Sequence, residues 1–174
     1  MNPHFLSYLL FRNQTIKPVL ADDLLQTART LVSSGKNRPK QSDLRRSVST
    51  AYYAMFHTLT RCCADLLVGT KKARRSSEAW YQVYRSLDHN GTRKACKNSK
   101  LTKFPTAIQD FADTFVSMQE KRHKADYDPN EKFFKSAVLN DIILVETNIK
   151  KFRGVQPKDR CAFAVFILLK ERNQ

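Results

Sequence analysis

One long amphipathic stretch constrains the fold more than any other part of this sequence. Between Leu44 and Gly69 (LRRSVSTAYYAMFHTLTRCCADLLVG), apolar residues recur every three or four positions, which is the period of an α-helix. The apolar stripe consists of Leu44, Val48, Ala51, Met55, Leu59, Cys62 and Leu66. A polar stripe runs beside it and consists of Arg46, Thr50, Tyr53, His57 and Arg61. The stretch predicts a central helix near 42–69 that packs one face in the core and turns the other toward a partner helix or a site.

Helical periodicity recurs along the rest of the chain. Further helices are predicted at 20–34, 77–89, 105–127, 130–152 and 158–172, with Asn90-Gly91 ending the second of these. Only four Gly and six Pro interrupt 174 residues, and few runs alternate as a strand would. A chain of this length holds one domain with a real core. We therefore predict an all-α, single compact bundle of about five to six helices over 20–174, preceded by an N-terminal extension at 1–19.

Basic residues outnumber acidic ones in this chain, with 31 Lys and Arg against 16 Asp and Glu and a net charge of +15. Such an excess indicates RNA or another polyanion as a partner, or simply the solvated surface of a basic protein. The excess concentrates at 71–75 and at 93–103, where the composition predicts a surface loop. The predicted RNA-binding residues are Lys71, Lys72, Arg74, Arg75, Arg93, Lys94, Lys97, Lys100 and Lys103.

The cysteines and the apolar segments narrow the class of protein. Cys62, Cys63, Cys96 and Cys161 lack metal-ligand spacing, which indicates free thiols in a reducing cytoplasm. No segment reaches the about 20 apolar residues of a membrane span, and the apolar run at 5–11 lacks the flanks of a signal peptide. Phosphate-binding glycine loops, paired carboxylates and nucleophile elbows are also missing. The sequence therefore predicts a cytoplasmic protein with no cofactor, no metal and no membrane segment.

Three groups of side chains are candidates for acid–base chemistry. Tyr53 and His57 lie one helical turn apart, as do Arg85 and His89. The third group brings a cation, an imidazole, a carboxylate and a phenol into two turns; its members are Arg122, His123, Asp126 and Tyr127. A histidine acting as general acid or base, with an arginine holding the charge, suffices for attack of an RNA 2′-OH on its neighbouring phosphate. The alternatives are structural hydrogen-bond networks, or cations placed favourably at a helix C-terminus.

Two segments together resemble HEPN-type proteins (higher eukaryotes and prokaryotes nucleotide-binding). Residues 45–57 (RRSVSTAYYAMFH) resemble the RRAVSxAYYAxFH helix of the family, and 122–129 (RHKADYDP) are similar to its R-x-x-ADYDP segment. The resemblance covers residues 20–172 and points to a small bacterial branch. It implies a compact helical bundle that forms a homodimer. It also implies a metal-independent endoribonuclease of a toxin–antitoxin or defence system, with a cognate antitoxin or partner protein.

The family's active site is an Arg-x4–6-His motif that meets a second copy of itself across the dimer. In this chain Thr50, Ala51 and Tyr52 occupy the positions where His57 would need the arginine. The nearest substitutes are the pairs Arg85/His89 and Arg122/His123. We therefore expect the arginines to hold phosphate and His123 or His89 to act as acid or base, with Asp126 and Tyr127 orienting them and Tyr53 and His57 as contacts. The alternative is a non-catalytic helical interaction module that binds a partner protein or a polyanion.

Overall fold

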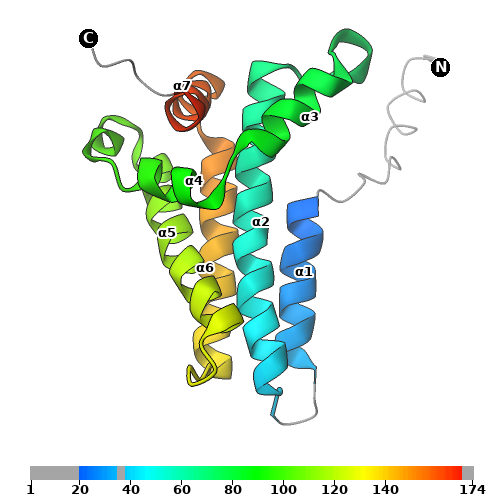
Figure 1. The fold of residues 1–174 in the computed structure, drawn as a ribbon, viewed down its shortest axis with the longest axis vertical. Coiled ribbons are helices and arrows are strands. Elements are labelled where there is room, and N and C mark those ends of the chain that lie inside the picture. The colour runs from blue at the N-terminus through cyan, green and yellow to red at the C-terminus, as the bar shows by residue number, and fades with distance from the viewer. Residues whose placement is uncertain (1–19, 35–37, 170–174) are drawn as a thin grey trace, which may run out of the picture.

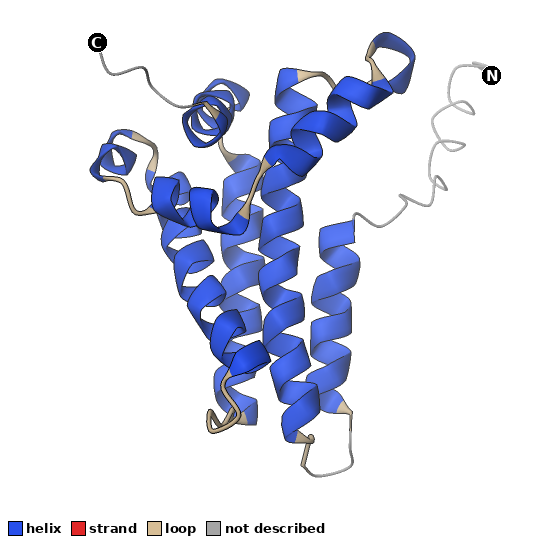
Figure 2. Cartoon of the chain, viewed as in Figure 1, coloured by secondary structure: helices blue, strands red, loops and turns tan. Residues whose placement is uncertain are grey.

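The computed structural model describes residues 20–34 and 38–169, and every regular element in these ranges is a helix (Figures 1 and 2). The elements are α1 (Leu20–Ser33), α2 (Gln41–Leu67), η2 (Lys72–Arg74), α3 (Ser77–Ser86), α4 (His89–Cys96), η3 (Ser99–Lys103), α5 (Thr106–Tyr127), α6 (Lys135–Gly154) and α7 (Pro157–Leu168). The all-α prediction is confirmed for this part of the chain, which contains seven α-helices where five to six were expected. The N-terminal extension at 1–19 lies outside the described residues.

Four long helices, α1, α2, α5 and α6, form the body of the molecule, and α3, α4 and α7 lie across its upper end in Figure 1. The central helix α2 contacts each of the other three long helices. The core between them includes the fully buried side chains of Met55, Phe111, Phe115 and Phe152. The rings of Phe111 and Phe152 stack with their centroids 4.3 Å apart, which joins α5 to α6. Each such side chain contributes about 1.5–3 kcal/mol by leaving water.

The apolar stripe of α2 faces the core as its spacing predicts. Leu44, Val48, Ala51, Met55 and Leu59 are buried, and Cys62 and Leu66 are partly buried near the end of the helix. The observed bounds of α2, Gln41–Leu67, lie within two residues of the predicted ones. None of the described helices is long and apolar enough to cross a membrane.

The region after α3 differs from the prediction. α3 ends at Ser86 and α4 begins at His89, so Asn90-Gly91 lies inside a new helix and does not end one. Asp88 causes this restart, because its carboxylate accepts a hydrogen bond from the backbone nitrogen of Gly91 at 2.7 Å and caps α4. A Cβ at Gly91 would lie 2.5 Å from Asp88 Oδ2, so glycine permits this close approach. The predicted loop at 93–103 is therefore the end of α4 followed by η3.

Candidate functional site

The two segments that carry the family resemblance touch each other in the fold. Arg45 of α2 donates hydrogen bonds to the backbone oxygens of Ala125 at 2.9 Å and Asp128 at 2.8 Å, where α5 ends. One turn further along α2, the hydroxyl of Ser49 donates to Asp126 Oδ1 at 2.6 Å. These contacts follow from the i, i+4 spacing of Arg45, Ser49 and Tyr53, which places all three on one side of α2. The side chain of Arg45 thus fixes the junction after α5.

Arg122 lies at the centre of the contact between α2 and α5. Its Nε forms an ion pair with Asp126 Oδ2 at 2.7 Å, and its Nη2 donates to the hydroxyl of Tyr53 at 3.0 Å. The guanidinium lies 5.6 Å from the ring centroid of Tyr53 and 5.7 Å from that of Tyr127. Desolvation would lower the pKa of Arg122, but Tyr53 and Asp126 outweigh it and raise the pKa. The result is a permanent cation whose side chain is 19% exposed.

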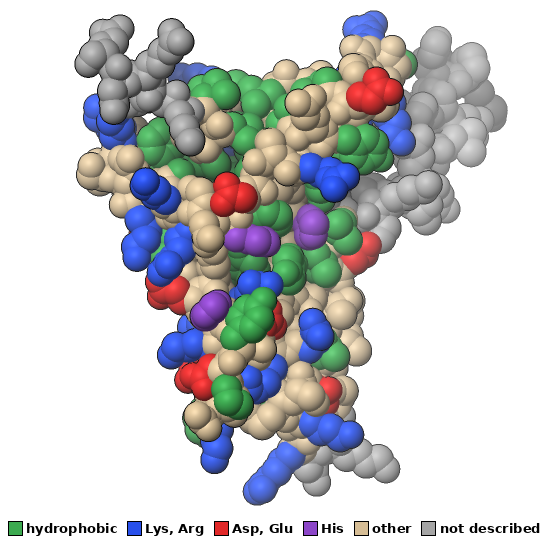
Figure 3. Space-filling view, in the orientation of Figure 1, with side chains coloured by type: hydrophobic (Ala, Val, Ile, Leu, Met, Phe, Trp, Pro, Cys, Tyr) green, Lys and Arg blue, Asp and Glu red, His purple; other side chains and the backbone are tan. Residues whose placement is uncertain are grey.

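Two histidines lie beside Tyr53, the tyrosine that accepts from Arg122. The ring centroid of Tyr53 is 6.3 Å from that of His57 and 6.1 Å from that of His89. The ring centroid of Phe56 lies 4.3 Å from that of His89, with the two planes tilted, and 6.0 Å from that of His57. Histidine side chains (purple) are visible on this face beside basic (blue) and hydrophobic (green) ones (Figure 3). We call Tyr53, His57, His89 and Arg122 the Tyr53 cluster.

Each histidine of the Tyr53 cluster is held by a tyrosine through Nδ1. The Nδ1 of His89 is hydrogen-bonded to the hydroxyl of Tyr52 at 2.6 Å, and the Nδ1 of His57 to the hydroxyl of Tyr84 at 2.7 Å. Within the described ranges, neither Nε2 has a hydrogen-bond partner. These contacts fix the two rings and leave the Nε2 atoms to meet a ligand.

The surroundings favour the neutral form of both imidazoles. Burial lowers the pKa of His57, and the nearby His89 lowers it further. Burial and the Arg122 cation lower the pKa of His89, against a smaller opposite effect from Asp88. Burial raises the pKa of Tyr52, so its phenol stays protonated beside His89. At neutral pH the cluster therefore contains neutral imidazoles next to one fixed cation.

The structure brings together only part of the predicted catalytic set. His57, His89 and Arg122 lie around Tyr53, and Asp126 orients the guanidinium. His123, the leading predicted acid–base residue, is exposed and packs against Tyr127 at 5.0 Å. Arg85 is exposed and has no hydrogen bond or ion pair within the described part of the chain. The expected partnership of Arg85 with His89 fails because Asp88 starts a new helix between them.

Sequence reasoning missed Tyr52, Tyr84 and Phe56 as members of this site. Tyr52 is completely buried and lies beside the predicted apolar stripe of α2, where its spacing suggests only packing. Tyr84 is contributed by α3, so only the tertiary contact between α3 and α2 reveals its role. The adjacent aromatic residues Tyr52-Tyr53 followed by Phe56-His57 were the available signal.

The predicted RNA-binding residues differ in how they are held. Lys71, Lys72 and Arg74 are exposed around η2. Arg75 differs, since its side chain is 10% exposed and lies 4.5 Å above the ring of Trp80, where it also donates to the backbone oxygen of Gly69. Its position indicates a structural role in attaching α3 to the end of α2.

The basic residues of α4 and η3 also differ in whether an acidic side chain pairs with them. Arg93 pairs with Glu120 of α5, and Lys97 lies 4.0 Å from the same carboxylate. Lys94 and Lys103 are exposed, and no ion pair engages them among the described residues. Lys94 and Lys103 therefore offer the least compensated charge to a polyanion.

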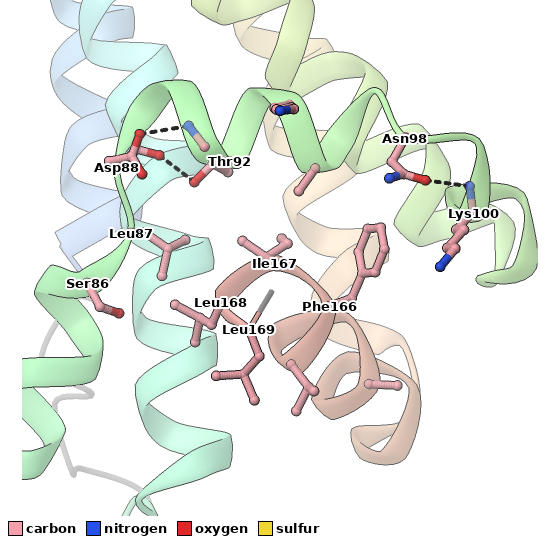
Figure 4. A pocket seen from close by; sticks show the side chains of 15 residues that line it. Ser86, Leu87, Asp88, Thr92, Asn98, Lys100, Phe166, Ile167, Leu168 and Leu169 are labelled. Carbon is pink, nitrogen blue, oxygen red and sulfur yellow. Dashed lines mark hydrogen bonds between the residues drawn. The ribbon is translucent and has the colours of Figure 1, made fainter. Parts of the chain in front are cut away.

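A cavity of about 780 Å³ lies apart from the Tyr53 cluster, between α4 and α7 (Figure 4). Figure 4 shows apolar side chains of α7, including Phe166, Ile167 and Leu168, along one side of it, with Leu168 nearest to Leu87. Asp88 and Asn98 line its rim and are both occupied as helix caps. His57, His89 and Arg122 do not line this cavity, so it is separate from the Tyr53 cluster.

No group of three or more His, Cys, Asp or Glu side chains in 20–34 and 38–169 is arranged to hold a metal ion. The four cysteines are free thiols.

Comparison of the chain with protein-family models, with curated proteins and with solved structures finds no match.

Proposed function

We propose that this protein is a HEPN-like, cytoplasmic RNA-binding protein that cleaves RNA without a metal ion, as a homodimer in a toxin–antitoxin or defence system. The observation that carries the proposal is the gathering of His57, His89 and Arg122 around Tyr53, with both Nε2 atoms available. Imidazoles that act as acid and base, together with a fixed guanidinium, are sufficient for phosphodiester transfer on RNA. The exposed basic residues of η2 and α4 supply the attraction for the RNA backbone.

The proposed reaction uses the three groups in separate roles. Arg122 binds the scissile phosphate through Nη1, since its Nε and Nη2 are engaged by Asp126 and Tyr53, and it neutralises the charge that develops there. One imidazole removes the proton from the 2′-OH, the O2′–P bond forms and the P–O5′ bond breaks. The other imidazole, in its protonated form, gives a proton to the departing O5′. The products are a 2′,3′-cyclic phosphate and a 5′-hydroxyl end.

The tyrosine partners allow either imidazole to take either role. In the neutral ring, Nδ1–H donates to the tyrosine oxygen, so Nε2 presents a lone pair and acts as a base. In the protonated ring, Nδ1–H still donates to the tyrosine oxygen and Nε2–H is the proton that the acid gives up. Tyr52 and Tyr84 therefore support the exchange of protons at Nε2 without moving the rings.

Cleavage of RNA in EDTA by purified variants tests this function. We expect His57→Ala and His89→Ala each to lower the cleavage rate by about 10²–10⁴-fold, since positioned acids and bases contribute that much. His123→Ala is the matched control, because this exposed histidine lies outside the Tyr53 cluster, and it retains the wild-type rate. Circular dichroism verifies that each variant is folded. Equal cleavage by the wild type and both cluster variants would reject the mechanism.

The second candidate function is a non-catalytic helical interaction module for a partner protein or polyanion. It is favoured by the contacts of Arg45, Ser49 and Asp126, which all stabilise the junction of α2 with α5. Under this hypothesis, RNA remains intact at every pH while a partner or polyanion still binds. RNA integrity and RNA affinity, measured on the same samples, separate the two functions.

A further inference from the structure

A small hollow between α2, α6 and α7 gathers arginines that the Tyr53 cluster does not use. It measures about 170 Å³, and Arg61, Arg153 and Arg160 line it from three different helices. Its other lining residues are Thr58, Cys62, Asp65 and Phe152. We call this site the arginine hollow.

The charges around the arginine hollow do not balance. Asp65 is the one acidic lining residue, and its carboxylate is already shared by several donors. Its Oδ1 accepts from Trp80 Nε1 at 2.8 Å and from Arg75 at 3.4 Å, while its Oδ2 pairs with Arg61 at 3.3 Å. Arg160 has no carboxylate partner within the described residues. Arg61 pairs with Asp65 and Arg153 pairs with Asp22 of α1, so the lining charge that no carboxylate balances among the described residues is that of Arg160.

The hollow is held in shape by the surrounding fold. Arg160 Nε donates to the backbone oxygen of Val155 at 3.0 Å, and Arg153 pairs with Asp22 of α1 at 2.8 Å. Phe152 forms an apolar part of the wall and is 1% exposed, which lowers the local dielectric and strengthens charge interactions. Burial raises the pKa of Cys62 to about 11, so its thiol adds no negative charge at neutral pH and lies against Arg160.

We propose that the arginine hollow binds the dianion of a phosphate monoester. Guanidiniums recognise phosphate oxygens with several directed hydrogen bonds, and those of Arg61 and Arg160 approach from different helices. Thr58 also lines the hollow, but its hydroxyl already donates to Ala54 O at 2.8 Å, so the arginines are the donors for the phosphate oxygens. A volume of about 170 Å³ admits one phosphate group, whereas pockets for whole cofactors or nucleotides measure about 300–1,000 Å³. The ligand therefore places only its phosphate in the hollow.

Inorganic phosphate is the first probe, added to the full chain at constant ionic strength while backbone amide shifts are followed by NMR. Wild-type protein gives a saturating shift that centres on α2 and the first turn of α7. Arg160→Gln weakens binding by about tenfold or more, as expected for loss of a charged hydrogen-bond donor. Arg46→Gln is the control, since it removes an exposed arginine of the same helix, and it leaves binding unchanged.

Arg61→Gln is a second variant of the hollow, which tests the same site if Arg160→Gln does not fold. Arg61 is half exposed, so its replacement is tolerated by the fold. A linear response to phosphate, or equal affinity in both hollow variants and the wild type, would overturn the proposal. Matched RNA oligonucleotides with a 5′-phosphate or a 5′-hydroxyl then identify the source of the group. A preference for the 5′-phosphate that Arg160→Gln abolishes supports an RNA end, and equal affinity for the two supports a free phosphate compound. Neither result depends on RNA cleavage by the Tyr53 cluster.

Discussion

Arg122 donates a hydrogen bond to the hydroxyl of Tyr53 at 3.0 Å, and this bond joins the middle of α2 to the last turns of α5. The same guanidinium is paired with Asp126, whose other oxygen accepts from Ser49. Arg122 therefore has one edge fixed by the fold, while two histidine rings lie beside its tyrosine partner. A cation oriented before any ligand arrives needs little reorganisation when a phosphate binds.

Removing the Tyr53 hydroxyl tests this link. Tyr53→Phe keeps the ring beside Arg122 but deletes the hydrogen-bond acceptor, and we expect the free energy of unfolding to fall by about 1–2 kcal/mol. Urea unfolding at neutral pH measures the change. Tyr81→Phe is the matched control, because Tyr81 is 61% exposed and removal of its hydroxyl costs nothing measurable. An unchanged stability of Tyr53→Phe would mean that Arg122 is held by Asp126 alone.

The lowered pKa values of His57 and His89 set the pH dependence of the proposed cleavage. The base must be neutral, so activity rises as pH increases through its pKa. The acid must be protonated, so activity falls as pH increases through the pKa of the second imidazole. Because both values lie below the ordinary histidine value of about 6.5, we expect a bell-shaped rate profile with its maximum below that pH. A maximum above pH 7 in initial rates would contradict these roles.

The same histidines make the stability depend on pH. Below about pH 6.5 the unfolded chain protonates both imidazoles, whereas the folded chain keeps them neutral until lower pH. The unfolded state then binds more protons, so the free energy of unfolding decreases as pH falls from 6.5 toward the folded pKa values. Thermal unfolding between pH 7.5 and 5 measures this slope. The double variant His57→Gln/His89→Gln flattens it relative to the wild type, and an unchanged slope in this variant would contradict the prediction.

The central helix was predictable because its hydrophobic period is long and unbroken, and its stripe from Leu44 to Leu59 is buried as expected. The restart at α4 was not predicted, since Asn-Gly commonly ends a helix and only the cap by Asp88 reverses that preference. The site residues on α2 and α5 were named from their spacing, but their partners were not. Tyr84 meets His57 through the packing of α3 on α2, which no local pattern encodes.

Ion pairs with acidic side chains decide how much each basic residue of α4 contributes to the proposed RNA binding. Lys94→Gln removes an exposed, uncompensated charge, and we expect it to reduce the slope of log affinity against log salt by about 1. Arg93→Gln has a smaller effect, because Glu120 already neutralises part of that charge. Lys135→Gln, where α6 begins at the opposite end of the bundle, is the control. Fluorescence anisotropy over a salt series measures the slopes, and equal slopes for all three variants would place the RNA elsewhere.

The exposed ring of Tyr127 leads us to expect that the proposed RNA ligand is single-stranded. The side chain of Tyr127 is 65% exposed beside His123 and Arg122, so under the proposed function its ring stacks on an unpaired base next to the phosphate assigned to Arg122. Tyr127→Ala therefore weakens the binding of single-stranded RNA by about 1–3 kcal/mol, while Tyr127→Phe retains it and duplex RNA binds equally to all three proteins. Tyr81→Ala removes an equally exposed ring on α3 and serves as the control. A loss of duplex affinity equal to the single-strand loss would assign Tyr127 to the fold and not to base stacking.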